Sequence, residues 1–368
     1  MDKLQIKDIT KLLENIAPLA LQESYDNSGL LVGSENQHVN GALISLDITE
    51  AIIDEAIAEN CNLIIAHHPI IFGGLKKLNG SNYIERCVIK AIKNDIAIYA
   101  IHTNLDNIWA GVNAKIAEKL NLKNTRILSP KADVLKKLVT FCPMAALEQV
   151  RTALFAAGAG AIGAYDECSF TSDGTGSFRA SADANPFVGK INERHYENET
   201  KLELVYPSYL EKAILQALIA SHPYEEVAYD LLVMTNKHKQ IGSGLIGELE
   251  TGQEEIEFLK QLKTNFNVSC IRHTNLLGNK VKKVALCGGS GSFLLKDAIN
   301  AGADVFISAD FKYHQFFDAE NRIVIADIGH YESEQFTKEL LYDIIRKNFS
   351  TFALRLTKIN SNPINYLY

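Results

Sequence analysis

Two adjacent histidines end a short apolar segment, Ile64-Ile-Ala-His-His-Pro69, and imidazole nitrogens are common metal ligands. The segment is too short for a helix and is rich in β-branched residues, so it predicts a buried strand. Pro69 cannot continue a central strand, which places His67 and His68 at the carboxyl end of that strand. Because open α/β sheets bind ligands at this edge, the pair indicates a metal site.

Two further segments place a carboxylate four residues after a histidine: His102 with Asp106, and His330 with Glu334. This spacing brings both side chains to one face where a strand runs into a helix. Nitrogen and carboxylate ligands without a thiolate suit zinc, manganese or iron. Five or six such ligands exceed what one ion usually takes from a protein, so we expect two divalent ions that share a bridging carboxylate.

The elements that must position these side chains alternate between strand and helix over residues 42–120. This alternation is typical of βαβ units and of a largely parallel sheet, in which the carboxyl ends of the strands share one edge. The predicted strands are 42–47, 64–69 and 96–106, and the predicted helices are 50–59, 82–94 and 110–120.

A weak internal repeat relates the two ends of the chain and predicts two related α/β halves. Polar residues fall at matching strand ends in both halves. The aligned pairs are Leu63–Ala66 with Val305–Ser308 and His68 with Asp310 at an offset of 242 residues, and Ile96–Ile101 with Val324–Gly329, His102 with His330 and Asp106 with Glu334 at an offset of 228.

Between these halves, a strand–helix–strand pattern occurs twice over about 100 residues, which predicts an inserted ferredoxin-like α+β domain. Residues 158–189 are rich in Gly, Ser, Ala and Asp and predict mostly loop, and Thr235–Gln240 predicts a linker. We therefore expect a discontinuous α/β domain at 1–130 and 240–368, and an inserted domain at 131–239. The predicted strands of the insert are 137–143, 201–206 and 227–234, and its predicted helices are 145–157 and 209–220.

Each candidate segment also has an ordinary structural interpretation. An isolated His-His-Pro is more often a turn than a ligand pair, His102 can cap a strand, and Glu334 can stabilise a helix amino end. The agreement of three segments, two of them at matching positions of the repeat, favours the metal site. Asp47, Asp310 and His314 follow strand ends, where they either orient ligands, contact substrate or are ordinary solvated residues.

Two other motifs favour a structural interpretation. Gly288-Gly-Ser-Gly-Ser292 follows a predicted strand as a phosphate-binding turn would, but it lacks the glycine spacing and the lysine of the nucleotide-binding motifs. His222-Pro-Tyr-Glu-Glu226 is better explained as a helix-to-strand turn than as a separate metal site. No Ser-His-Asp or Cys-His nucleophile pattern stands out in the sequence.

Composition narrows the class of protein. The formal net charge of −7, without a basic run, disfavours nucleic acid and anionic membranes as the main partner. The sequence has no signal-like apolar segment at its start and no run of about 18 apolar residues. Its six cysteines are scattered without a Cys-x-x-Cys pair, which favours reduced thiols. We expect a cytoplasmic protein.

Four motifs in order resemble the Nif-three-like dinuclear metal centre family, often labelled GTP cyclohydrolase 1 type 2 homologs. The resemblance covers residues 1–130 and 240–368, and the middle segment is similar to the PII-like or CutA-like insert of the longer bacterial members. Tyr25 stands where many relatives have tryptophan. The motifs are Ser24-Tyr-Asp-Asn-Ser-Gly-Leu-Leu-Val-Gly33, His67-His-Pro69, His102-Thr-Asn-Leu-Asp106 and Gly329-His-Tyr-Glu-Ser-Glu334.

This resemblance implies that Glu334 bridges two divalent ions and that His102 lies close by. It also implies a toroidal homohexamer, assembled from trimers if the insert trimerises as PII-like domains do, with the metal sites facing an internal cavity. The metal ligands that the resemblance assigns are His67, His68, Asp106, His330 and Glu334.

Two functions follow as hypotheses. The first is a metal-dependent hydrolase acting on a small molecule, with a nucleotide as one candidate. For a GTP cyclohydrolase, activated water would attack C8 of the purine, and His102 or His314 would move protons. The positively charged side chains of Lys76, Lys77 and Lys312 are candidates for contacts with phosphate groups. The second is a non-catalytic regulatory or metal-handling protein; a scaffold held together by closed metal sites is disfavoured.

Overall fold

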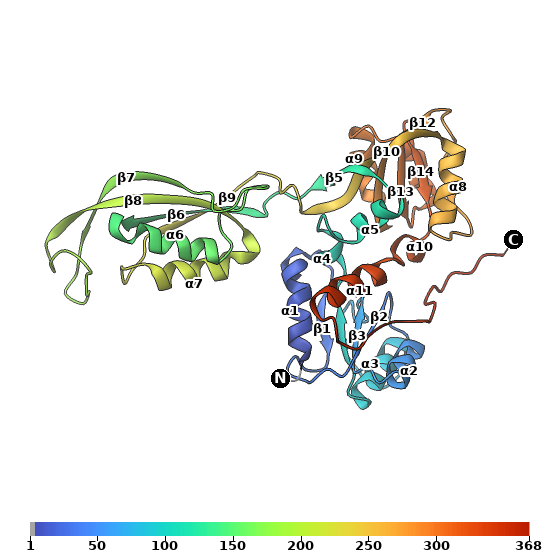
Figure 1. The fold of residues 1–368 in the computed structure, drawn as a ribbon, viewed down its shortest axis with the longest axis horizontal. Coiled ribbons are helices and arrows are strands. Elements are labelled where there is room, and N and C mark those ends of the chain that lie inside the picture. Colours follow the sequence, from blue (N-terminus) through green and yellow to red (C-terminus); the bar gives the residue numbers. More distant parts are fainter. Residues whose placement is uncertain (1–3, 368) are drawn as a thin grey trace. The chain divides into compact units, whose positions relative to one another are not determined.

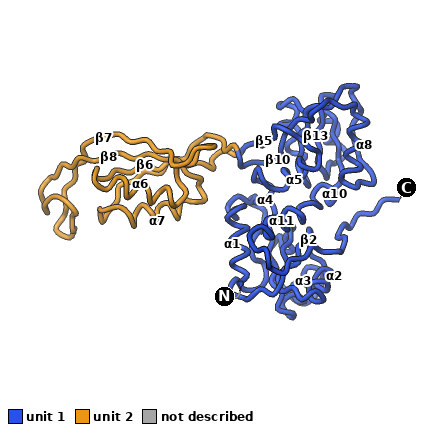
Figure 2. The backbone as a smooth tube through the Cα atoms, viewed as in Figure 1, with its two compact units in different colours: residues 1–130, 240–368 blue, residues 131–239 orange. Residues whose placement is uncertain are grey.

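The computed structural model describes residues 4–367, which form two compact units (Figure 1). Figure 2 shows unit 1, residues 1–130 with 240–368, in blue and unit 2, residues 131–239, in orange. Residues 1–3 and 368 lie outside the described part of the chain. Within the described residues, no helix is long and apolar enough to cross a membrane. All six cysteines are free thiols.

The first sheet of unit 1 has the strand order β1-β4-β3-β2-β15, with β1 antiparallel to β4 and the other neighbours parallel. Every residue of β2, β3 and β4 is buried. Continuous apolar strands of this kind are typical of a parallel sheet covered on both faces. The strands are β1 (Gly29–Val32), β2 (Ala42–Ser45), β3 (Leu63–Ala66), β4 (Ala97–Ala100) and β15 (Leu354–Leu356).

The second sheet of unit 1 has the order β11-β14-β13-β12-β10-β5. Its strands β12, β13 and β14 are parallel, whereas β11, β10 and β5 are antiparallel to their neighbours. The strands are β5 (Lys123–Pro130), β10 (Gly242–Glu254), β11 (Arg272–His273), β12 (Lys280–Ser290), β13 (Val305–Ala309) and β14 (Val324–Asp327).

Helices cover these sheets and bury an apolar core on each. The side chains of Thr49 and Asn82 accept hydrogen bonds from the first turns of α2 and α3, which fixes where these helices begin. The helices of unit 1 are α1 (Ile6–Ile16), α2 (Glu50–Ala58), α3 (Tyr83–Lys93), α4 (Thr103–Asp106), α5 (Val112–Lys119), α8 (Glu255–Asn265), α9 (Leu295–Asn300), α10 (His330–Glu334) and α11 (Thr337–Asn348), with 3-10 helices η1 (Leu19–Leu21), η4 (Ser292–Leu294) and η5 (Tyr313–Ala319).

The predicted pair of related α/β halves is confirmed by the topology. The parallel strands β2-β3-β4 and β12-β13-β14 occur in the same order, and each set has an antiparallel strand beside its last member. The repeat aligned β3 with β13 and β4 with β14. One prediction was wrong: the strand expected over 96–106 ends at Ala100, and Thr103–Asp106 forms the short helix α4. The equivalent strand β14 likewise runs into the short helix α10.

Unit 2 has the order β-α-β-β-α-β, with its antiparallel strands arranged β7-β8-β6-β9. This is the ferredoxin-like arrangement. Helices α6 and α7 share a core with one face of the sheet, where Leu138, Leu202 and Leu218 are fully buried. The elements are β6 (Leu135–Pro143), η2 (Met144–Ala146), α6 (Leu147–Ala156), β7 (Phe170–Arg179), β8 (Arg194–Pro207), η3 (Ser208–Leu210), α7 (Glu211–Ser221) and β9 (Tyr229–Val233).

The prediction of mostly loop over residues 158–189 was wrong for β7. Every residue of Phe170–Arg179 is exposed or only half-buried, so the strand lacks the apolar alternation that identifies a half-buried strand. Pairing along its whole length with β8 defines this edge strand instead. Hydrogen bonding to a partner distant in sequence therefore overrides the local glycine-rich composition.

Candidate metal centre

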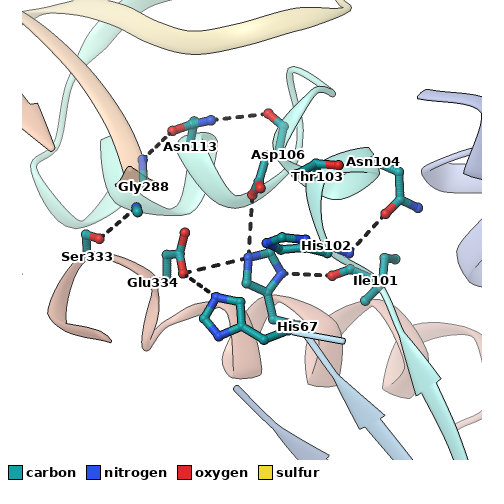
Figure 3. A network of polar contacts seen from close by, with 12 residues as sticks. His67, Ile101, His102, Thr103, Asn104, Asp106, Asn113, Gly288, Ser333 and Glu334 are labelled. Carbon is teal, nitrogen blue, oxygen red and sulfur yellow. Dashed lines mark hydrogen bonds and ion pairs between the residues drawn. The ribbon is translucent and has the colours of Figure 1, made fainter. Parts of the chain in front are cut away.

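The carboxyl ends of β3, β4 and β14 bring the candidate ligands together. His67 and His68 follow β3 directly. After β4, His102 precedes α4 and Asp106 is its last residue, and α10 begins with His330 after β14. Because both sheets are parallel at these strands, their polar residues collect at one edge of each sheet. Figure 3 shows Asp106 and Glu334 next to the ring of His67, although Glu334 belongs to the other half of unit 1.

Each of the four histidines is held through its Nδ1 atom. His67 Nδ1 donates to the carbonyl oxygen of Ile101 at 2.8 Å. His68, His102 and His330 are held through Nδ1 by carboxylates at 2.7–2.8 Å. A metal-binding histidine usually donates its other ring N–H in this way, which fixes the tautomer and leaves Nε2 as a lone-pair donor.

Three of these Nε2 atoms face a single oxygen of Glu334. Glu334 Oε2 lies 2.9 Å from Nε2 of His68, 3.1 Å from Nε2 of His330 and 3.9 Å from Nε2 of His67. The Nε2 atoms of His68 and His330 are themselves 3.3 Å apart. Two lone-pair nitrogens and a carboxylate oxygen at such distances repel one another unless a cation or a proton lies among them.

Two atoms of the cluster are buried without any hydrogen-bond partner. They are Nε2 of His67 and Oδ1 of Asp106, which lie 3.6 Å apart. Because an unpaired buried polar atom costs free energy, two such atoms side by side indicate a site for an ion or a water molecule. Both are good ligands for a divalent ion, so the donor set fits the metal that the sequence predicts.

The potential ligand atoms form two triads that share Glu334. One triad is His68, His330 and Glu334, and the other is His67, Asp106 and Glu334; within each, the ligand atoms lie within 4.8 Å of one another. Shared membership makes Glu334 the candidate bridging carboxylate between two sites. The potential ligand atoms of His102, His67 and His68 also lie within 4.8 Å of one another.

The carboxylates of the cluster favour positive charge on the imidazoles beside them. Burial opposes the charged form of both His68 and His330, but the carboxylates around them raise the pKa of His68 to about 9 and that of His330 to about 11. Burial alone would raise the pKa of Glu334, yet the surrounding imidazoles, His330 first, hold it well below its usual range. Burial of its Oδ1 atom and the neighbouring Glu334 charge raise the pKa of Asp106 above its usual value. The negative charge of the ionised Glu334 therefore favours a cation beside it, either a proton on an imidazole or a metal ion.

A glycine segment at the end of β12 lies directly behind Glu334. The backbone N–H of Gly289 donates to Ser333 Oγ at 2.9 Å, which ties β12 to helix α10. Gly289 has a positive φ of 59°, and a Cβ atom there would lie 2.3 Å from Oε1 of Glu334. Gly288 N–H donates to Asn113, whose amide donates in turn to the backbone oxygen of Asp106. The segment therefore positions both carboxylates rather than binding phosphate.

Asp26 is a residue of the site that the sequence argument missed. Its side chain is fully buried, and its Oδ1 accepts from His102 Nδ1 at 2.8 Å. Its Oδ2 accepts from the backbone N–H of Thr103 at 3.0 Å and from the Ser28 hydroxyl at 3.1 Å. The sequence did single out the turn-rich motif that begins at Ser24 and contains Asp26. Nothing in that motif indicated that the Asp26 carboxylate would hold the ring of His102.

The remaining candidates divide into two groups. Asp47 and Asp310 hold Nδ1 of His68 and His330 respectively, so they orient ligands. His314 is exposed on η5, where its ring contacts those of Tyr313 and Phe317. The three lysines considered for phosphate contacts, Lys76, Lys77 and Lys312, are exposed.

His222 in unit 2 has a structural role. Its Nε2 bonds to the carbonyl oxygen of Phe141 at 3.0 Å, and its Nδ1 accepts from the backbone N–H of Tyr224 at 3.1 Å. Both ring nitrogens are therefore engaged by the backbone, and burial lowers the pKa of the ring. A neutral, fully engaged imidazole of this kind stabilises the turn between α7 and β9.

Comparisons with known proteins agree over the whole chain. The family model described as Duf34/NIF3 (NGG1p interacting factor 3) matches residues 4–363. A Bacillus subtilis protein named GTP cyclohydrolase 1 type 2 homolog is 39% identical over 370 residues, which cover 98% of each chain. A Staphylococcus epidermidis protein of the same name is 34% identical, over 99% of this chain and 100% of its own.

Solved structures give the same result. A Bacillus cereus protein related to NIF3 superposes with a TM-score of 0.85 at 36% identity, covering 100% of both chains. A Staphylococcus aureus protein superposes with a TM-score of 0.79 at 30% identity, again over 100% of both. The chain belongs to the Duf34/NIF3 family.

Proposed function

We propose that this protein holds two divalent metal ions, zinc, manganese or iron, and acts as a metal-dependent hydrolase on a small molecule. One observation carries the proposal: two buried ligand atoms, His67 Nε2 and Asp106 Oδ1, have no hydrogen-bond partner and stand beside Glu334. The residues that would hold the ions are His67, His68, Asp106, His330 and Glu334.

Bound ions would supply Lewis-acid chemistry and lower the pKa of a coordinated water toward neutrality. The protein contributes rigid orientation. Ile101, Asp47 and Asp310 hold the rings of three histidines through Nδ1, so each Nε2 keeps its direction toward the cluster. Such orienting contacts are worth about 10–100-fold in metal affinity at comparable sites.

Exposure supports a substrate-accessible centre rather than a closed structural site. The side chains of Asp106 and His330 are 24% and 35% exposed, whereas those of His67 and Glu334 are almost completely buried. A structural site is normally enclosed by four ligands, and a catalytic site keeps an open side. The names of the curated relatives make GTP the first substrate to test.

His102 is our candidate for proton transfer. Its Nδ1 is held by the buried carboxylate of Asp26, and its side chain is 13% exposed. Asp26 fixes the tautomer that leaves Nε2 free to accept a proton beside the cluster. His314 is the less favoured candidate, because the contacts of its ring are with Tyr313 and Phe317.

The test combines metal analysis with GTP turnover. We expect about two ions per chain and a ring-opened or pterin-type product, and we expect Glu334→Gln to lose both metal and turnover. Glu332→Gln is the matched control, because Glu332 is also buried in α10 but its Oε1 accepts from Asn362. His102→Gln should keep the metal and lose turnover. Retention of two ions by Glu334→Gln would contradict the proposed site.

A non-catalytic role in regulation or metal handling is the second candidate. The separate unit 2 favours it, because a second compact unit with its own core can report a ligand without taking part in chemistry. Two ions per chain without turnover of GTP or of phosphoester and amide substrates would select this role.

We also propose that copies of the chain assemble as a homohexamer and that unit 2 acts as a PII-like insert within it. Resemblance to the family motifs supports this proposal. Light scattering on the purified protein is the test: we expect about six times the chain mass of 40.7 kDa. A monomeric mass at micromolar concentration would refute it.

A further inference from the structure

The chain after β15 returns to the edge of the first sheet that carries the candidate ligands. β15 pairs with β2 in the parallel sense, with Leu356 opposite Ile44. Parallel strands end at the same edge of a sheet, so the residues after Leu356 emerge where Asp47 follows β2 and His68 follows β3. The C-terminal segment therefore starts beside the candidate metal centre.

Hydrogen bonds and an apolar contact fix the first residues of this segment. The backbone N–H of Thr357 donates to the carbonyl oxygen of Ile44 at 2.9 Å, which extends the pairing of β15. Glu55 in α2 accepts from the Thr357 hydroxyl and, at 2.8 Å, from the backbone N–H of Lys358. Ile359 packs against the apolar core of the first sheet. The chain is thus anchored as far as Ile359.

The next residues contact both halves of unit 1. We call residues 360–362 the C-terminal clamp. The Ser361 hydroxyl donates to Oδ2 of Asp47, in the first half, at 2.5 Å. The Asn362 side-chain amide donates to Oε1 of Glu332, in helix α10 of the second half, at 3.0 Å. Ser361 and Asn362 are half-buried. The clamp therefore joins the two halves beside the metal centre.

Ser361 acts on a candidate metal ligand through Asp47. Oδ1 of Asp47 accepts from Nδ1 of His68 at 2.7 Å, while its Oδ2 accepts from Ser361. Each carboxylate oxygen is thus held by one partner, which keeps the carboxylate from turning away from the ring. Hydrogen bonds to the second nitrogen of a ligand histidine fix its tautomer and the direction of its lone pair. Ser361 therefore helps to aim Nε2 of His68.

The contacts of the clamp lie on the side of one triad of ligand atoms. Asp47 holds His68, and Glu332, which accepts from Asn362, lies two residues after His330 in α10. His68 and His330 belong to the same triad. In the other triad, the histidine ring is oriented by the backbone carbonyl oxygen that follows β4. The two triads thus differ in what orients them.

We propose that Ser361 is a positioning residue for one of the two metal ions, the ion of the triad with His68 and His330. Asn362 fastens the clamp to the helix that carries His330. This inference rests on the metal centre proposed above. Loss of the Ser361 hydroxyl lets the Asp47 carboxylate turn, so His68 loses its fixed direction. The ion of the triad with His67 and Asp106 does not depend on this contact.

Zinc titration of the full-length protein against a competing chelator tests the proposal, because each binding step has its own dissociation constant. We expect Ser361→Ala to weaken one ion by about 10-fold, the scale of contacts that orient a metal ligand. The other ion should bind as in the wild type. Ser361→Thr keeps the hydroxyl and should bind both ions normally.

Ser81→Ala is the matched control, because the Ser81 hydroxyl also donates to a carboxylate, that of Glu85, at 3.0 Å. It should bind both ions as the wild type does, because this bond holds no residue of the metal centre. A purely structural role of Ser361 would weaken both ions alike.

The proposal is overturned if Ser361→Ala binds both ions with wild-type affinity, if it weakens both equally, or if Ser361→Thr binds as poorly as Ser361→Ala. A wild type that binds no ion would refute the metal centre and the role of the clamp together. Failure of the clamp alone is therefore distinguishable from failure of the metal centre, since in that case the wild type still binds two ions.

Discussion

Replacing Gly289 by alanine should disable the metal centre without unfolding the protein. The new Cβ atom would lie 2.3 Å from Oε1 of Glu334 and 3.1 Å from Cε1 of His330. The closer atom is the end of a flexible side chain, which can move aside at small cost to folding. The same movement takes the candidate bridging carboxylate out of its position among the histidines.

The size of the effect follows from the geometry. Relieving a 2.3 Å contact to an ordinary van der Waals distance moves the Glu334 carboxylate by about 1 Å. Ligand distances in metal sites must hold within about 0.2 Å, and losing the contacts that orient a ligand costs up to about 100-fold in metal affinity. We therefore expect metal affinity to fall about 100-fold, or about 2.7 kcal/mol.

A second glycine supplies the control for backbone strain. Gly163 has a φ of 63°, against 59° at Gly289, and a Cβ atom at Gly163 would meet nothing within 4 Å. Each alanine substitution should therefore cost about 1–2 kcal/mol of stability from the left-handed backbone. Only Gly289→Ala should weaken metal binding, measured by zinc titration against a competing chelator. Wild-type affinity in Gly289→Ala would refute the assignment of Glu334 as a ligand.

Three further predictions concern stability. Metal at 100 times its dissociation constant should raise the free energy of unfolding by about 2.7 kcal/mol, and a chelator should reverse this increase. A thermal unfolding temperature that does not change on addition of metal would contradict the site. Glu85→Ala should cost about 1–3 kcal/mol in urea unfolding, because the buried Glu85 carboxylate accepts from the backbone N–H groups of Asn79 and Ser81; a change below 0.5 kcal/mol, about the scale of an ordinary surface substitution, would contradict it. Burial alone would raise the pKa of Asp26, but hydrogen bonds from His102 and Thr103 outweigh it and lower the pKa below the usual value of 3.8. The stabilisation from the ionised Asp26 is therefore complete above the unfolded-state pKa of this carboxyl and is lost as pH falls below about 4. The free energy of unfolding of the wild type should thus fall more than that of Asp26→Asn between pH 6 and pH 3. Equal losses in the two proteins would show that the pKa of Asp26 is not lowered.

Much of unit 1 could be predicted from the sequence because its signals are local. Short apolar segments bounded by turn residues identified β2 and β3, and the cap residue Thr49 identified the start of α2. The repeat aligned β3 with β13, and parallel strands bring their carboxyl ends to a common edge. This is why separate motifs at His67 and Glu334 could be placed in one site.

The missing parts depend on contacts between distant segments. Asp26 and His102 are 76 residues apart, and only the fold shows that one carboxylate accepts from both the ring and the next backbone N–H. Strand β7 is defined by its pairing with β8, because eight of its ten residues are polar or glycine and its two phenylalanines do not form an apolar alternation. The role of Gly289 needed the position of Glu334, which comes from a helix 41 residues later.

Metal content per chain tests the central claim most directly. The purified protein, reconstituted with zinc, manganese or iron(II) and dialysed, would be analysed for bound metal beside Glu334→Gln and its control Glu332→Gln. The account predicts about two ions per chain in the wild type and in Glu332→Gln, and a loss of metal in Glu334→Gln. No bound ion in the wild type with any of the three metals would contradict it.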